Sequence, residues 1–143
     1  MHFDPKDDGI THINVYSKGK TFLGKWLSNF TYSPIETIDG KFNSIEGYWY
    51  WLSIQDERFR KLHGFKAKQL GRELNANDWP NTYMFRQRIK AAILYKILSK
   101  PEIIVKLKRN KLPLTHYYVY GDKVINVPNA EWIINFLTEF CDG

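Results

Sequence analysis

The strongest constraint on the fold is a run of apolar residues at helical spacing between positions 81 and 99. These residues recur every three or four positions and so form one stripe on a helix; they are Phe85, Ile89, Ala92, Ile93 and Ile97. Arg86, Arg88 and Lys90 fall largely off this stripe. The pattern predicts a long helix over residues 81–99 with one face against a core.

Shorter signals predict further helices and small strands. Ser44 is suited to cap a helix that runs to Ile54, and Pro101 suits the first turn of another. The predicted helices span residues 44–54, 57–63, 65–74, 81–99, 101–108 and 129–140. The predicted strands span residues 13–16, 34–38, 41–44, 117–120 and 123–126, with turns at Asp39-Gly40 and Gly121-Asp122. The predicted fold class is mainly α with small β-hairpins, and residues 17–33 look irregular.

The length and composition fit one globular domain that follows a short leader. The chain has 143 residues, of which 43% are hydrophobic, enough to bury a core. We expect a flexible leader at residues 1–10 and a single domain at residues 11–143. The single cysteine, Cys141, permits no intrachain disulfide, which fits a reducing compartment. No signal peptide or stretch of about 18 apolar residues is found, so the expected location is cytoplasmic.

The charge and the aromatic content leave two interpretations each. The formal net charge of +6 favours anionic partners such as phosphates, nucleotides or nucleic acid. The basic residues are spread along the chain, however, which is also typical of an ordinary solvated surface. Aromatic residues make up 16% of the chain. They can line a pocket in which flat rings stack, or they can fill a core.

Several familiar motifs are excluded. The segment 19–26 nearly matches a phosphate-binding loop, but Trp26 stands where Ser or Thr must hold Mg²⁺. The four histidines lack the spacing of metal ligands, so no zinc site is predicted. The Gly-x-Ser-x-Gly and Gly-x-Gly-x-x-Gly patterns are absent from the sequence. We therefore expect no metal and no cofactor.

Glu46 is the first candidate for a reactive group. Trp49, Tyr50 and Ser53 follow it at three, four and seven residues and so share its helix face. A carboxylate beside large aromatic rings is partly desolvated, which raises its pKa and suits a general base or a group that stabilises a cation. The alternative is a glutamate that merely favours the helix dipole at its N-terminus.

Lys68 and Arg72 form a second candidate group. They are four residues apart on a predicted helix and so project from the same face, next to Gly71. Two cations on one face can hold a phosphate. The alternative is an ordinary basic surface.

Four short motifs occur in an order that resembles the NADAR (YbiA-like) family. They are Leu27-Ser28-Asn29-Phe30, Ser44-Ile45-Glu46, Ala67-Lys68-Gln69-Leu70-Gly71-Arg72 and Asp78-Trp79. Residues 114–120, together with Trp132, resemble a phage and bacterial branch of this family. Gly47 and Tyr50 stand where many members of the family have His and Gln.

The resemblance implies a compact, mainly helical fold and an N-glycosidase. Some members cleave ribosylamine intermediates of riboflavin synthesis, and others remove ADP-ribose from guanine bases. It implies Glu46 as the catalytic carboxylate, with Asp78 either a second carboxylate or a helix cap. The implied partner is a nucleotide, a phosphoribosyl molecule or ADP-ribosylated nucleic acid, in a bacterial or phage-infected cell. The candidate substrate-binding residues are Asn29, Phe30, Trp49, Tyr50, Lys68, Gly71, Arg72, Trp79 and Tyr118.

Two other classes of protein stay open. The same rings and cations would serve a non-catalytic module that binds ADP-ribose or a nucleotide. A phage interaction protein with a retired site is the other alternative. Turnover of a ribosyl substrate distinguishes the enzyme from both.

Overall fold

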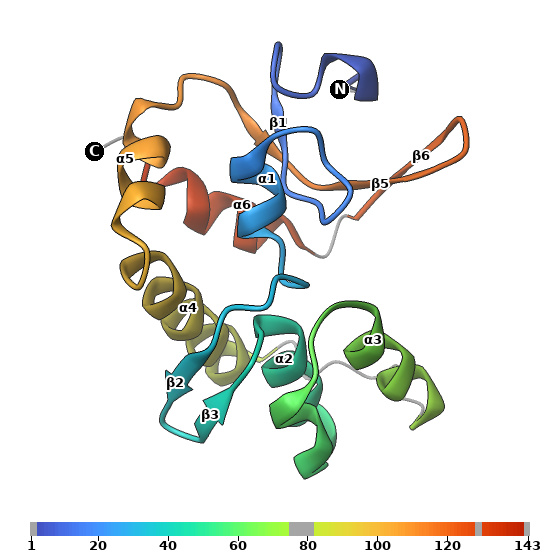
Figure 1. Ribbon diagram of the computed structural model, residues 1–143, viewed down its shortest axis with the longest axis vertical. Coiled ribbons are helices and arrows are strands. Elements are labelled where there is room, and N and C mark those ends of the chain that lie inside the picture. The colour runs from blue at the N-terminus through green and yellow to red at the C-terminus, as the bar shows by residue number, and fades with distance from the viewer. Residues whose placement is uncertain (1–2, 75–81, 128–129, 142–143) are drawn as a thin grey trace. The chain divides into compact units, whose positions relative to one another are not determined.

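Helices make up most of the secondary structure (Figure 1). The computed structural model describes residues 3–74, 82–127 and 130–141. The helices in these ranges are α1 (Phe22–Leu27), α2 (Ile45–Ile54), α3 (Gly64–Glu73), α4 (Tyr83–Leu98), α5 (Pro101–Arg109) and α6 (Glu131–Thr138), with the 3₁₀ helices η1 (Pro5–Asp7) and η2 (Glu57–Lys61). The strands are β1 (Ile13–Asn14), β2 (Ile35–Thr37), β3 (Gly40–Phe42), β4 (Leu114–Thr115), β5 (Tyr117–Tyr120) and β6 (Lys123–Asn126). The predicted fold class, mainly α with small hairpins, is confirmed.

The chain divides into two compact units. Unit 1 consists of residues 1–28 and 101–143, and unit 2 consists of residues 29–100. The sequence predicts one domain and gives no signal for this division, because no linker-like stretch separates the two parts.

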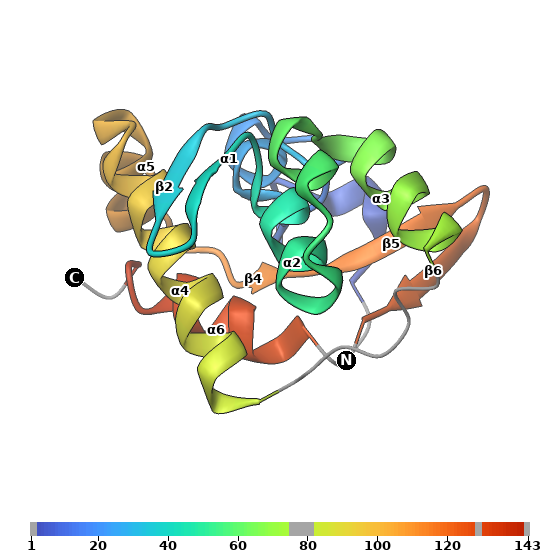
Figure 2. The ribbon, with the colours of Figure 1, turned by 90° about the horizontal axis from the view of Figure 1, so that it is seen from below.

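Unit 2 is built around α2. This helix packs against η2, α3 and α4, and α2 lies beside α3 in both views (Figure 1, Figure 2). Part of the core forms between α2, η2 and α3, where the buried side chains are Tyr50, Phe59, Ala67 and Leu70. The rings of Tyr50 and Phe59 stack at 5.4 Å. The predicted helices at 44–54 and 65–74 are thus confirmed, while residues 57–61 form a 3₁₀ helix.

The long helix α4 confirms the apolar stripe. All five stripe residues are buried: Phe85, Ile89, Ala92, Ile93 and Ile97. The helix begins after Thr82, whose hydroxyl accepts a hydrogen bond from the Phe85 N–H at 3.2 Å. Lys96 is buried beside the stripe, and this burial lowers its pKa to about 7. A spacing pattern of apolar residues does not reveal a buried lysine.

The β2–β3 hairpin is tied to two helices through its turn. The strands pair antiparallel with Ile35 opposite Phe42, and the turn contains the predicted Asp39-Gly40 pair. Oδ2 of Asp39 accepts hydrogen bonds from the Tyr48 hydroxyl of α2 at 2.6 Å and from Nη1 of Arg88 of α4 at 2.7 Å. The turn therefore fixes α2 and α4 against the hairpin.

Unit 1 contains two strand pairs. Strands β1 and β4 pair in parallel, with Ile13 opposite Leu114. Strands β5 and β6 form the predicted antiparallel hairpin, with Tyr117 opposite Asn126 (Figure 1). The helix α6 packs against β4 and buries Ile133 and Leu137. This unit therefore mixes short strands with helices, as the sequence predicts.

The expectation of irregular structure at residues 17–33 is wrong for α1. Thr21 caps this short helix by accepting a hydrogen bond from the Gly24 N–H at 2.9 Å. Gly24 lets the helix approach β1, because a Cβ there would lie 2.2 Å from the Asn14 carbonyl oxygen. A six-residue helix held by such a close approach has little local sequence signal.

Residues 3–10 belong to the fold of unit 1. Asp8 is buried, and its carboxylate accepts hydrogen bonds from the N–H groups of Asn14 at 2.9 Å and of Lys20 at 2.8 Å. The Gly9 N–H donates to the His12 carbonyl at 2.7 Å. This segment, which the sequence predicts to be a flexible leader, thus holds the start of β1.

Candidate functional site

The first turn of α2 is fixed by Ser44. Its buried hydroxyl accepts a hydrogen bond from the Gly47 N–H at 3.0 Å, as expected for a helix cap. The same hydroxyl donates to the Leu62 carbonyl at 3.0 Å. Ser44 therefore both starts the helix and ties it to the end of η2, which sets where Glu46 lies.

Gly47 allows this turn to pack closely on η2. A Cβ at Gly47 would lie 2.4 Å from the Phe59 carbonyl oxygen and 3.1 Å from the Leu62 carbonyl oxygen. These contacts involve backbone, which cannot move aside cheaply. A histidine has no room here, so this departure from the family pattern follows from packing in this chain.

The segment with Asn29 and Phe30 runs along the same turn. The Glu46 N–H donates to the Asn29 carbonyl at 3.0 Å, which satisfies one of the free donors of the helix start. The side-chain amide of Asn29 makes no hydrogen bond to any residue that the structure describes. Nζ of Lys68 lies 5.9 Å from the centre of the Phe30 ring. Asn29, Phe30, Glu46 and Lys68 thus come together within unit 2.

The carboxyl group of Glu46 is unusual because nothing that the structure describes hydrogen-bonds it. Burial raises its pKa to about 7, against an opposing effect of the nearby Lys68 charge. A glutamate that served only the helix dipole would gain less than about 1 kcal/mol from remaining ionised. Burial outweighs that gain, and the group is half ionised near neutral pH. Such a group can both accept and donate a proton at neutral pH.

The helix α3 presents Lys68 and Arg72 on one side. The side chain of Arg72 is exposed, whereas Lys68 is partly buried. The two residues are one turn apart, as the sequence predicts. A phosphate held by both would lie at the edge of the Glu46 site.

Tyr50 and Gly71 prove to be packing partners. Tyr50 is buried in the core between α2 and α3. A Cβ at Gly71 would lie 2.3 Å from Cε1 of Tyr50, so only glycine lets the two helices approach this closely. Their predicted contact with substrate has no support in this geometry, and we leave both residues out of the proposed site.

Trp49 and Ser53 follow Glu46 along α2. The Trp49 ring is partly buried and meets the Phe85 ring edge-on, with centroids 4.8 Å apart. Oγ of Ser53 is buried and has no hydrogen-bond partner among the described residues. Trp49 remains a candidate for stacking on the base of a substrate, because its ring is not fully covered.

Three predicted site residues cannot be grouped with Glu46. Tyr118 lies on β5 in unit 1, where its ring contacts the rings of Tyr16, His116 and Tyr120. Asp78 and Trp79 lie outside the described residues. The roles of all three stay predictions of the sequence.

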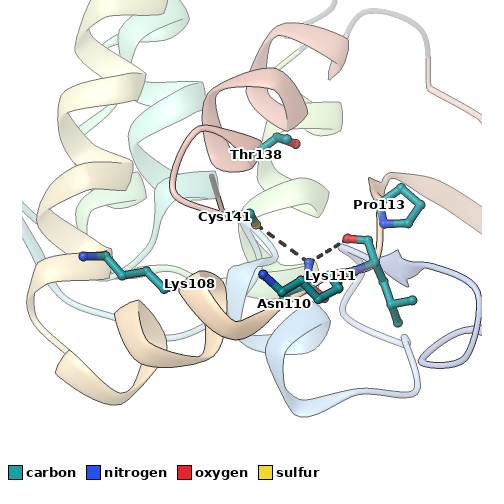
Figure 3. Close-up of a pocket in the computed structure, with 7 residues that line it drawn as sticks. Lys108, Asn110, Lys111, Pro113, Thr138 and Cys141 are labelled. Carbon is teal, nitrogen blue, oxygen red and sulfur yellow. Dashed lines mark hydrogen bonds between the residues drawn. The ribbon is translucent and has the colours of Figure 1, made fainter. Parts of the chain in front are cut away.

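Unit 1 has a pocket of its own that the sequence does not predict (Figure 3). Its volume is about 520 Å³, and its lining residues are Lys108, Asn110, Lys111, Leu112, Pro113, Thr138 and Cys141. The Asn110 amide donates to the Leu112 carbonyl at 2.6 Å and contacts Sγ of Cys141 at 3.7 Å. Its polar groups therefore hold the loop together, which leaves the Glu46 site as the better candidate.

No group of three His, Cys, Asp or Glu side chains in the described ranges lies close enough to bind a metal ion. None of the helices described combines the length and hydropathy that crossing a membrane requires.

The fold is similar to that of a solved protein. No protein-family model matches the chain, and no curated protein sequence matches it. The NMR structure of the Escherichia coli protein YbiA is similar with a TM-score of 0.62 and 19% sequence identity. The match covers 93% of this chain and 88% of that one. The chain therefore has a YbiA-like fold, as the motif resemblance implies.

Proposed function

We propose that the protein is an N-glycosidase that hydrolyses a ribosyl C–N bond, with Glu46 as its reactive group. The observation that carries this proposal is a carboxyl group whose burial raises its pKa to about 7 and which has no hydrogen bond from any described residue. A buried polar group without a partner destabilises a fold. Such groups recur at catalytic sites because the chemistry requires them.

The reaction needs a carboxylate near the anomeric carbon. When the C–N bond breaks, the electron pair leaves with the nitrogen and positive charge develops on the ribose, by analogy with O-glycoside hydrolysis. Ionised Glu46 would stabilise that charge. It would then take a proton from the attacking water as the new C–O bond forms. The departing nitrogen would take a proton from solvent, to which Glu46 later returns its own.

Nearby groups suit the rest of an ADP-ribose-type or ribosylamine-phosphate substrate. The amide of Asn29, which no described residue hydrogen-bonds, suits a ribose hydroxyl, and Lys68 with Arg72 suits a phosphate. Trp49 suits stacking on the base. Within this proposal the ring of Phe30 would help to position the Lys68 ammonium group by a cation–π contact.

The remaining sequence predictions extend the same proposal. Asp78 would be a second carboxylate or a helix cap, and Trp79 and Tyr118 would stack on the base. We further propose membership of the NADAR family, in its phage and bacterial branch, and action inside a cell. The YbiA-like fold supports membership at the level of fold.

The test is the variant Glu46→Gln, which keeps the shape of the side chain and removes its charge. We expect hydrolysis of ADP-ribosylated guanine DNA, or of a ribosylaminouracil phosphate, to fall about 10²–10⁴-fold, the usual contribution of a general acid or base. Glu73→Gln is the matched control, because Glu73 is exposed on α3 of the same unit. Product is measured as released base or sugar.

Two outcomes would count against the enzyme. If Glu46→Gln turns over as fast as the wild type, the assignment of Glu46 is wrong. If the wild type binds these ligands and returns them intact, the alternative of a non-catalytic ADP-ribose or nucleotide-binding module is favoured.

A further inference from the structure

One short segment of unit 2 contains basic residues and no acidic ones. Residues 58–72 contain six basic residues and no acidic one; they are Arg58, Arg60, Lys61, Lys66, Lys68 and Arg72. Outside this segment the chain carries 15 basic and 15 acidic residues. Residues 58–72, which span most of η2 and α3 and the turn between them, therefore carry six positive charges with no carboxylate among them.

Not all of this charge is neutralised locally. Nη2 of Arg58 lies 2.7 Å from Oδ2 of Asp56, and Nε of Arg60 lies 2.6 Å from Oε2 of Glu57. Lys61 and Lys66 are exposed, and neither forms an ion pair with a residue in the described ranges. These two lysines thus extend a positive field beyond the candidate site of Lys68 and Arg72.

Exposed aromatic rings accompany these lysines. Phe65 is 61% exposed and Tyr32 is 57% exposed. The rings of Tyr32 and His63 meet edge-on with centroids 5.3 Å apart. Tyr32 therefore lies against the start of α3. We call Tyr32, Lys61, His63, Phe65 and Lys66 the basic aromatic surface.

We propose that the basic aromatic surface binds single-stranded nucleic acid. A single strand alternates phosphates with flat bases, and proteins bind it with cations along the backbone and aromatic rings that stack on the bases. Lys61 and Lys66 would contact phosphates, and the rings of Tyr32 and Phe65 would stack on bases. The binding does not depend on the reaction proposed above.

An anionic membrane fits this surface less well. A helix that lies in a membrane interface needs an apolar stripe. The exposed positions of α3 are Phe65, Lys66, Gln69, Arg72 and Glu73. Phe65 is the one apolar residue among them, so α3 has no such stripe.

The basic aromatic surface continues into the candidate site. Phe65, Lys68 and Arg72 are spaced by three and seven residues and so share one face of α3. Lys68 in turn lies close enough to Glu46 to lower its pKa. A strand on this surface would therefore run past the candidate carboxylate.

The first arm of the test measures charge. Fluorescence anisotropy of a fluorescein-labelled 12-nucleotide oligodeoxythymidylate is followed against the full chain over a range of salt concentrations. Loss of two phosphate contacts in the double variant Lys61→Gln/Lys66→Gln should reduce the slope of log K against log salt by about 1.4. The matched control is Lys108→Gln/Lys111→Gln, which removes two exposed lysines of the unit 1 pocket and should leave the slope unchanged.

The second arm measures stacking. Tyr32→Ala and Phe65→Ala should each weaken binding about tenfold, within the range for one stacked base. Tyr83→Ala removes another exposed ring of unit 2 and is the control. The measured quantity is binding and not turnover, which keeps this result separate from the glycosidase test.

Three results would overturn the proposal. The first is that the wild type does not bind the oligonucleotide. The second is that Lys108→Gln/Lys111→Gln reduces the salt slope as much as Lys61→Gln/Lys66→Gln does. The third is that both Tyr32→Ala and Phe65→Ala bind as tightly as the wild type. Binding to phosphatidylserine vesicles without binding to the oligonucleotide would overturn it in favour of a membrane.

Discussion

Two carboxyl groups of unit 2 differ in their surroundings: Asp39 lies in the β2–β3 turn and contacts α2, and Glu46 lies in the first turn of α2. Asp39 accepts hydrogen bonds from Tyr48 and Arg88 at 2.6 and 2.7 Å. The hydrogen bond to Asp39 raises the pKa of Arg88. The pKa of Tyr48 is raised to about 12, first by burial and then by the hydrogen bond to Asp39. Glu46 has no hydrogen-bond partner among the described residues, and burial raises its pKa to about 7.

The difference separates a structural carboxylate from a candidate functional one. Hydrogen bonds compensate for the lost hydration of Asp39, so the fold accounts for it. The described contacts of Glu46 do not compensate in this way. A fold keeps such a group at a cost in stability when function needs it.

The largest expected change in stability is that of Glu46→Gln, which removes the ionisable group from its buried position. Below pH of about 4.5 the carboxyl group is protonated in both the folded and the unfolded chain. As the pH rises to about 7, the unfolded chain ionises first, and the wild type loses up to about 3 kcal/mol of stability that the variant keeps. Urea denaturation at pH 4 and pH 8 measures this. If the difference in free energy of unfolding between the variant and the wild type is the same at both pH values, the burial of Glu46 is contradicted.

Asp39→Ala should have a smaller effect of the opposite sign. Removing the acceptor leaves the Tyr48 hydroxyl and the Arg88 guanidinium without their carboxylate, at a cost of about 2 kcal/mol. Denaturation at pH 7 measures the loss. Asp122→Ala, in the exposed β5–β6 turn, is the control and should change stability by less than about 0.5 kcal/mol. Equal stability of the two variants would show that the hairpin turn does not anchor α2 and α4.

The smallest effect concerns the neighbour of Glu46. Lys68 lowers the pKa of Glu46, so Lys68→Met should raise that pKa above about 7. A ¹³C NMR titration of the Glu46 carboxyl carbon measures the change. Lys66→Met, on the exposed side of α3, should leave it unaltered. A fall in the Glu46 pKa in Lys68→Met would contradict the closeness of the two groups.

The local signals in the sequence predicted much of this fold. The cap at Ser44 is confirmed because a serine at a helix start acts through its own backbone neighbours. The stripe on α4 is confirmed because helical spacing alone determines which side chains share a face. The assignment of Glu46 and Lys68, from two separate motifs, to one site came from the family resemblance.

Features that depend on tertiary contacts were not predictable in this way. Gly71 looked like part of a phosphate site, but the ring of Tyr50 fills the space beside it. Gly47 stands where many members of the family it resembles have His, and the backbone of η2 leaves no room there for a side chain. The burial of Lys96 likewise depends on what covers α4, which no spacing of residues specifies.

The central claim is that ionised Glu46 performs the reaction, and the pH dependence of kcat/KM tests it most directly. With a ribosyl substrate of the kind named above, kcat/KM should rise between pH 5 and pH 9 with a midpoint near pH 7, because that is where Glu46 ionises in the free protein. A profile that stays flat through pH 7 would contradict the claim.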